Sequence, residues 1–129
     1  GGFVVWDMGT GSEDSMAHPI DDADCDIAMV VLAVNTGPKK IASREGMDHT
    51  VATSPFYTAW VETAKQDLVD IKAAIASRDF EKLGQITEHN GMKMHATTLS
   101  ANPPFTYWSA DSLVAQEAVR QVREESGLP

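Results

Sequence analysis

The sequence predicts an α+β fold in which one or two β-strands are followed by three helices. A short apolar and aromatic run spans residues 3–6, and a continuous apolar run of eight residues spans 27–34. After residue 54, apolar residues recur at intervals of three and four, which is the period of helices. Because the helices follow the strands instead of alternating with them, the pattern favours α+β over a βαβ succession.

The composition limits the classes of partner. The chain has 129 residues, 43% of them hydrophobic, and carries 19 acidic against 10 basic residues for a net charge of -9. This length suits one domain, and the acidic balance argues against nucleic acid and against an anionic membrane surface. Cys25 stands alone, so no internal disulfide forms and a cytoplasmic location is expected. No run of 18 apolar residues predicts a membrane span.

The two predicted strands differ in strength. The run 27–34 has the length and the Val and Ile content of a strand buried on both faces, although a buried helix stays open as an alternative. Four aspartates precede it at 21, 22, 24 and 26. A calcium loop beginning at Asp22 needs Gly at its sixth position and Glu at its twelfth, where Ile27 and Ala33 stand, so a solvated acidic loop is expected instead.

Three helices follow. The first is expected from an N-cap at Ser54, with Pro55 at its first position, to about Ser77. Asp79 should cap the second helix. Gly84 and Gly91 weaken that helix, which favours close packing against a neighbour over a ligand-facing surface.

The second helix should end before 102–104, where Asn-Pro-Pro cannot continue a helix. Ser109 should cap the third helix, and Gly127 stands where a terminating glycine belongs. Its expected apolar stripe includes Leu113, Val119 and Val122.

A basic stretch, 39–47, lies between the predicted strand and the first helix. It holds three of the ten cations, Lys39, Lys40 and Arg44, together with Ser43 and a glycine. Cations, a hydroxyl and a glycine near a helix start suit an anion site, although a solvated loop would show the same residues. No histidine pair has zinc-ligand spacing, so no metal site is expected within the chain. His95 is expected to be a partly buried helix residue rather than a site residue.

Several segments carry the wording of a known family. They are Ser43-Arg44-Glu45-Gly46-Met47, Thr50-Val51-Ala52-Thr53-Ser54-Pro55-Phe56-Tyr57, Asp79-Phe80, Leu83-Gly84, Glu88, Asn90, Met92, Met94-His95-Ala96-Thr97 and Pro103-Pro104-Phe105-Thr106-Tyr107. Together with the opening Gly1-Gly2-Phe3, they closely resemble the diphosphomevalonate decarboxylase family, bacterial type, of the GHMP kinase superfamily. The resemblance covers essentially the whole chain.

The resemblance implies an activity. Such enzymes convert 5-diphosphomevalonate and ATP to isopentenyl diphosphate, ADP, phosphate and CO2, with Mg²⁺, in the mevalonate pathway of isoprenoid biosynthesis. By resemblance, Ser43 lies where substrate and γ-phosphate meet, Arg44 contacts the substrate diphosphate and Met47 lines the substrate pocket. Lys39 and Lys40 lie in a basic loop near the nucleotide phosphates.

The resemblance also implies a fragment. Residues 1–22 would end the N-terminal GHMP domain and its connection, and 23–129 would form part of the C-terminal domain. The ATP loop would lie upstream and the catalytic Asp downstream, so the fragment alone is expected to be inactive. Unpaired strand edges at 27–34 would favour a homodimer or other self-association.

Two other interpretations stay open at this stage. The chain could belong to another GHMP kinase, such as a mevalonate or phosphomevalonate kinase, which would stop at phosphoryl transfer without releasing CO2. It could also be a non-catalytic helical interaction module whose basic stretch is only a solvated surface. The second interpretation expects no effect of Arg44→Ala on activity.

Overall fold

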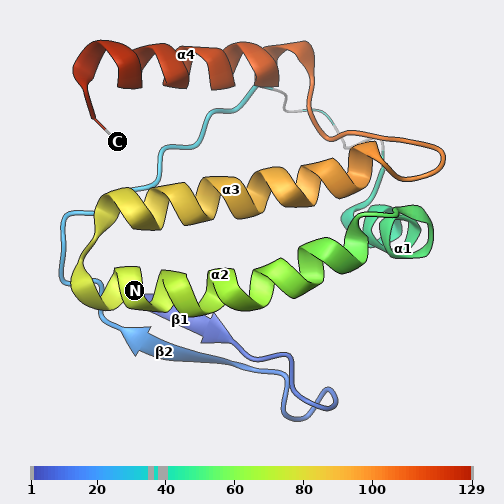
Figure 1. The fold of residues 1–129 in the computed structure, drawn as a ribbon, viewed down its shortest axis with the longest axis horizontal. Coiled ribbons are helices and arrows are strands. Elements are labelled where there is room, and N and C mark those ends of the chain that lie inside the picture. Colours follow the sequence, from blue (N-terminus) through green and yellow to red (C-terminus); the bar gives the residue numbers. More distant parts are fainter. Residues whose placement is uncertain (1, 35–36, 38–40, 129) are drawn as a thin grey trace.

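The computed structural model describes residues 2–34, 37 and 41–128 (Figure 1). Two strands and four helices follow one another along the chain. Their bounds are β1 Phe3–Trp6, β2 Ala17–Asp21, α1 Ser43–Thr53, α2 Tyr57–Ser77, α3 Phe80–Leu99 and α4 Ala110–Ser126. The fold is α+β as expected, with one helix more than the three predicted.

The elements are stacked side by side (Figure 1). The β1–β2 hairpin lies along one side of α2, α3 lies along the other, and α4 lies beyond α3. α1 lies across one end of the α2–α3 pair, and the segment 22–34 passes behind α3 from the hairpin towards α4. The described residues of the predicted site, Ser43, Arg44 and Met47, therefore lie at one end of the molecule, on α1.

The hairpin confirms the strand at 3–6 and adds one that the sequence did not indicate. β1 and β2 pair antiparallel, with Val5 opposite His18 and an irregularity between Phe3 and Val4. β2 reads Ala-His-Pro-Ile-Asp, which lacks the alternation of a strand, and Pro19 is tolerated because it lies in a two-stranded sheet with only edges.

The predicted strand 27–34 is wrong for this chain. These residues belong to no helix or strand, and Met29, Val30 and Val31 are 90%, 82% and 80% exposed. A strand needs a partner for its backbone groups, and the only sheet among the described residues is the β1–β2 hairpin. These eight residues are apolar enough to be buried, but in this structure they are largely exposed.

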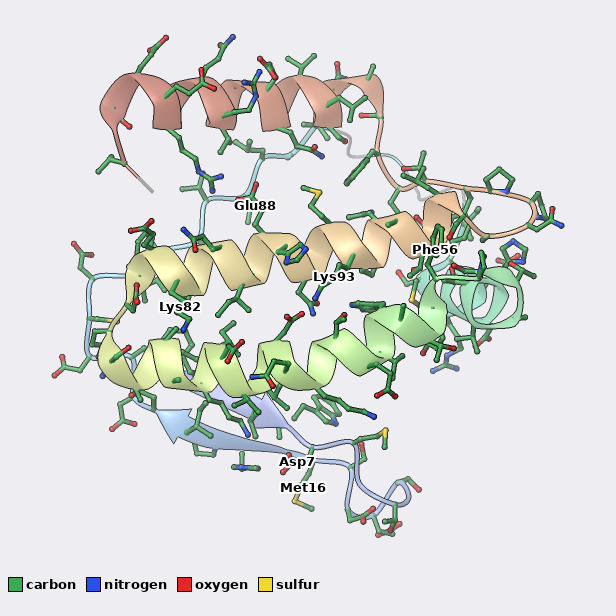
Figure 2. All side chains as sticks on the ribbon, viewed as in Figure 1. Asp7, Met16, Phe56, Lys82, Glu88 and Lys93 are labelled. Carbon is green, nitrogen blue, oxygen red and sulfur yellow. The ribbon has the colours of Figure 1, made fainter. Side chains whose placement is uncertain are left out.

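α2 and α3 form the main helix pair, and a polar seam joins them. The carboxylate of Asp67 on α2 accepts from Asn90 Nδ2 at 2.6 Å and from Lys93 Nζ at 2.5 Å, both on α3. The Nζ of Lys93 also donates to Thr63 Oγ1 at 3.2 Å. Lys93 extends from α3 towards α2 (Figure 2). Hydrogen bonds from Lys93 and then Asn90 hold the pKa of Asp67 below its usual value.

The predicted caps hold at three of four helix ends. Asp79 accepts from the backbone N–H of Lys82, Ser109 closes a capping box with Ser112, and Gly127 ends α4 with φ +67°. The start of α2 was wrong. Ser54 ends α1, and its hydroxyl bonds to that of Ser100 at 2.7 Å, so α2 begins at Tyr57 without a side-chain cap.

The predicted role of Gly84 and Gly91 was also wrong within the described residues. A Cβ built on either glycine would meet no atom within 4 Å, so neither is required by a close neighbour. α4 is equally open: none of its residues is buried, and the predicted stripe residues Leu113, Val119 and Val122 are all exposed. The ion pair between Arg123 Nη1 of α4 and Glu88 Oε2 of α3, at 2.7 Å, bridges the two helices.

The buried residues are few. The buried apolar residues are Val5, Ala74, Ile75 and Ala101, and the buried polar residues are Thr50, Thr97 and Thr98. At the other end of the α2–α3 pair, Arg78 Nη1 bonds Asp21 Oδ1 at 2.8 Å and ties the hairpin to the end of α2. A hydrogen bond from this guanidinium holds the pKa of Asp21 below its usual value.

Candidate functional site

Residues 43–47 of the predicted anion stretch lie at the start of a helix, α1, rather than in a loop. Ser43 and Arg44 are the first two residues of α1, and Met47 follows one turn later. Residues three and four apart share a helix face, so Met47 lies beside both Ser43 and Arg44. Lys39 and Lys40, the predicted nucleotide-binding residues, lie outside the described residues. The structure thus brings three of the five predicted site residues together.

The sequence did not predict helix α1 because the face that this helix packs against the rest of the molecule carries small and polar residues. Gly46, His49, Thr50 and Thr53 recur at three and four residues along α1, but none is a large apolar side chain. Glycine, histidine and threonine are also weak helix formers. Tertiary contacts along this stripe therefore outweigh the intrinsic preference. The three-and-four spacing of small and hydroxyl residues was the signal that could have revealed it.

The first turn of α1 offers positive charge. Ala42 precedes the helix in an extended conformation and supplies no side-chain acceptor, so the helix dipole presents its positive end here. Ser43 and Arg44 are exposed. The guanidinium of Arg44 makes no ion pair with a carboxylate in the ranges that the structure describes. Glu45, also in the first turn, offsets part of this charge.

The rest of α1 is fixed to the loop between α3 and α4, residues 100–108, here named the 100–108 loop. Nε2 of His49 donates to the carbonyl of Pro103 at 2.8 Å, because a carbonyl can only accept. The hydroxyl of Thr53 accepts from the backbone N–H of Asn102 at 2.9 Å, and the Ser54 hydroxyl meets that of Ser100. These contacts hold the C-terminal half of α1.

The space above Gly46 is filled by the same loop. A Cβ on Gly46 would collide with the Tyr107 hydroxyl and would lie 3.1 and 3.2 Å from ring carbons of Phe105. The rings of Phe105 and Tyr107 meet edge to face at 5.5 Å, and the His49 ring lies 5.9 Å from Phe105. From the sequence, this glycine could have allowed an anion to approach closely or could have lain in a solvated loop, but in the structure the side chains of Tyr107 and Phe105 fill the space.

His95 contacts the 100–108 loop from α3. Its ring lies 4.3 Å from that of Trp108, and burial lowers the pKa of His95, which favours the neutral imidazole. It is half-buried, as expected for a helix residue of the interior. Its contact is with Trp108 rather than with the first turn of α1.

Two cavities of the described chain lie away from α1. One, of about 210 Å³, lies where Phe3 and Cys25 approach Ala74, Ile75 and Arg78. The other is an open groove of about 1550 Å³ between α3, α4 and the segment 22–32, here named the α3–α4 groove. Neither is lined by Ser43, Arg44 or Met47. These two cavities therefore lie apart from the predicted site residues on α1.

Among the described residues, no cluster of three or more His, Cys, Asp or Glu side chains could hold a metal ion. No described helix has both the length and the hydropathy that crossing a bilayer requires.

An exposed arginine and a serine thus lie at the positive end of α1 on an α+β scaffold, an arrangement that suits an anion such as phosphate. Residues 29–127 match the family described as "Mevalonate 5-diphosphate decarboxylase C-terminal domain". The chain therefore belongs to that family, as its wording at 43–107 suggested.

Similar proteins agree with this assignment. The chain is 31% identical over 132 residues to a diphosphomevalonate decarboxylase of Aspergillus fumigatus, covering 98% of this chain and 33% of that protein. The mevalonate diphosphate decarboxylase structure from Staphylococcus aureus is 36% identical with a TM-score of 0.83, covering 96% of this chain and 38% of the other.

A third relative contains ligands. The structure described as "MDDEF in complex with MVAPP, AMPPCP and Magnesium" is 40% identical with a TM-score of 0.80, and covers 93% of this chain and 37% of the other. In all three comparisons this chain spans about a third of the relative's length.

Proposed function

We propose that this chain is a segment of an ATP-dependent decarboxylase that converts 5-diphosphomevalonate to isopentenyl diphosphate, with release of ADP, phosphate and CO2. The observation that carries the proposal is the exposed pair Ser43 and Arg44 at the positive end of α1, in a chain that belongs to the decarboxylase family. Related structures with MVAPP and with an ATP analogue support these substrates.

Arg44 binds the substrate diphosphate. A guanidinium pairs with two phosphate oxygens at once, and no carboxylate of the described chain competes for it. Met47, half-buried one turn further on, provides apolar contact for the carbon skeleton. The substrate is thus held through its charged end and packed along its apolar one.

Ser43 is the catalytic residue of this segment. Its hydroxyl positions the transferring γ-phosphoryl group next to the tertiary 3-hydroxyl of the substrate. The 3-hydroxyl oxygen attacks the γ-phosphorus, its proton passes to a base that this segment is not proposed to supply, and ADP leaves. The C–O bond of the new phosphate ester then breaks with departure of inorganic phosphate, and the electrons of the bond to the carboxylate form the alkene as CO2 departs.

ATP and Mg²⁺ are the proposed cofactors of the intact enzyme. Lys39 and Lys40 approach the nucleotide phosphates in this proposal. Among the described residues no group of three or more His, Cys, Asp or Glu side chains could hold a metal ion, so no Mg²⁺ ligand is proposed among them.

The domain division follows the same proposal. Residues 1–22 end the N-terminal GHMP domain and its connection, and residues 23–129 form part of the C-terminal domain. The family match at 29–127 supports this division. Because the chain provides one wall of the site, we expect the isolated segment to release no CO2. Soluble, highly charged substrates are consistent with a cytoplasmic enzyme.

Self-association of the isolated segment is part of the proposal. Met29, Val30 and Val31 are more than three-quarters exposed, which leaves an apolar run open to another copy of the chain. Sedimentation at tens of micromolar should show dimers or larger species. A clean monomer would contradict this expectation.

Steady-state kinetics of the full-length protein test the proposed roles. Arg44→Ala should raise the KM for 5-diphosphomevalonate about 10- to 100-fold, because a charge-assisted hydrogen bond is worth about 1.5–3 kcal/mol. Ser43→Ala should lower kcat more than it changes KM. Arg120→Ala is the matched control, since that exposed arginine pairs with Glu117 and Glu124 on its own helix.

Two outcomes would overturn the proposal. Wild-type kinetics for both Arg44→Ala and Ser43→Ala would exclude the site and would favour a non-catalytic helical module. Formation of ADP without CO2 by the wild-type protein would instead indicate a kinase of the same superfamily.

A further inference from the structure

We propose that Gly46 and His49 are positioning residues, which fix the rotation of α1 against the 100–108 loop and thereby place Arg44 for diphosphate binding. This inference rests on the proposed function, since it concerns the same first turn of α1. It adds two residues and a loop that make no contact with substrate in the proposal.

The steric part of the argument concerns Gly46. This residue is buried, and the aromatic loop lies so close that an added Cβ would collide with the Tyr107 hydroxyl and press on Phe105 at 3.1 and 3.2 Å. Such distances require the neighbouring side chains to shift. A glycine here allows α1 to approach the loop more closely than any other residue would.

The polar part concerns His49, one turn further along the same face. Its Nε2–H donates to Pro103 O at 2.8 Å, and its ring packs at 5.9 Å against Phe105. One contact alone would leave α1 free to turn about its axis. Contacts at Gly46 and His49, three residues apart on one face, together define that rotation.

The consequence falls on Arg44, two residues before Gly46. A long side chain amplifies a small rotation of its helix at the distance of the guanidinium. Misplacement of a binding group by about 1 Å can cost about 100-fold in rate. The hydrogen bonds of Thr53 to Asn102 and of Ser54 to Ser100 hold the C-terminal end of α1. Together with the contacts at Gly46 and His49, they fix the helix along its length.

The first test uses the full-length protein with Gly46→Ala. The KM for 5-diphosphomevalonate should rise about 10-fold or more, with the KM for ATP unchanged. Adding Tyr107→Phe to Gly46→Ala removes the hydroxyl that the new methyl group meets, and should recover part of the loss. A merely structural defect would lower kcat through the active fraction and leave both KM values as they are.

The second test separates the two contacts of His49. His49→Gln keeps an N–H donor near the position of Nε2 and should stay within about 3-fold of the wild-type KM, whereas His49→Phe keeps an aromatic ring without the donor and should raise it about 10-fold. His89→Gln, at an exposed position of α3, is the matched control and should leave the kinetics unchanged. If Gly46→Ala fails to fold, the His49 series alone decides.

The outcomes distinguish this inference from the proposed function. If Arg44→Ala weakens substrate binding but Gly46→Ala, His49→Phe and His49→Gln all match the wild type, the positioning role is wrong and the site stands. If His49→Gln is as impaired as His49→Phe, the hydrogen bond to Pro103 is not what positions α1. If Arg44→Ala itself has no effect, the proposed function fails first.

Discussion

The C-terminal end of α3 and the face along its length differ in the contacts that they make. At its C-terminal end, α1 and the 100–108 loop meet in a corner built on buried threonines and on hydrogen bonds from side chains to the backbone. Along its length, α3 faces a wide groove that α4 and the segment 22–32 also line, with exposed apolar side chains and the bridging pair Arg123–Glu88. Of the proposed site residues, Ser43, Arg44 and Met47 lie on the helix of this corner, and none of the three lines the groove.

This difference shows that apolar content and burial need not coincide. The most apolar run of the chain, at 27–34, is exposed, whereas Thr50, Thr97 and Thr98 are almost completely buried. Hydroxyl groups can be buried without loss when each finds a partner, and those of Thr50, Thr97 and Thr98 bond to carbonyls of their own helices at 2.6–2.8 Å. The corner is complete within this chain, while the groove has apolar surface without a partner among the described residues.

The largest expected effect tests the corner. Gly46→Ala should destabilise the 129-residue chain by about 2–3 kcal/mol, because overpacking against Phe105 and Tyr107 forces side chains to move. Urea unfolding of the variant against the wild type measures the change. A loss below about 0.5 kcal/mol would show that the 100–108 loop moves to accommodate the methyl group. The corner would then be no more closely packed than the groove.

A smaller effect is expected at the seam between α2 and α3, which joins the two regions. Asp67→Asn should cost about 1.5 kcal/mol at pH 7, because Lys93 then loses the charge it bonds to. The folded-state pKa of Asp67 is lowered, so its contribution is present above the unfolded value of about 3.9 and is lost as the pH falls through the folded value.

The acid dependence provides the check on that interpretation. The difference in unfolding free energy between the wild type and Asp67→Asn should shrink as the pH falls below about 4. A difference that is constant down to about pH 2 would place the stabilisation elsewhere. Asp70→Asn, one turn away on α2, provides a control carboxylate outside this seam, since its oxygen accepts from Gln66 of the same helix.

The next effect has the opposite sign and tests the open side. Gly84→Ala and Gly91→Ala should each stabilise the chain by about 0.5–1 kcal/mol, because alanine is the better helix former and its methyl group meets no described atom within 4 Å. Thermal unfolding of each variant measures this gain. Destabilisation by either change would mean that a neighbour approaches α3 closely at that position.

The smallest effect is expected where exposure is greatest. Val31→Ser should change the unfolding free energy by less than about 0.5 kcal/mol, because its side chain is 80% exposed and holds nothing in place. The same change should weaken self-association in sedimentation. Unchanged association would locate the contact between copies elsewhere, for example on α4.

Sequence reasoning succeeded where a local rule decides the structure. Asp79 and Ser109 were identified as caps, and Gly127 as a terminator, because each depends on bonds or torsions within a few residues. Phe3–Trp6 was identified from its β-type residues alone. These elements need no knowledge of distant parts of the chain.

Prediction from the sequence failed where the structure depends on a partner that is distant in the chain. The run 27–34 has the composition of a buried strand, which is why a strand was expected. Composition carries no information on whether a partner strand exists, and the described residues provide none. α1 was read as a loop because its helix depends on contacts with residues about 50 positions away, such as His49 with Pro103. The roles of the candidate site residues Ser43, Arg44 and Met47 were predicted from the resemblance to the family. The residue types alone indicated only that an anion site was possible.

The most direct test of the central proposal is the stoichiometry of CO2 and ADP. The full-length protein would be given ATP, Mg²⁺ and 5-diphosphomevalonate labelled in its carboxyl group, alongside Arg44→Ala and the control Arg120→Ala. We expect one labelled CO2 for each ADP, with the rate at low substrate reduced about 10- to 100-fold in Arg44→Ala alone. ADP without labelled CO2, or equal rates for all three proteins, would contradict the assignment of a decarboxylase site to the first turn of α1.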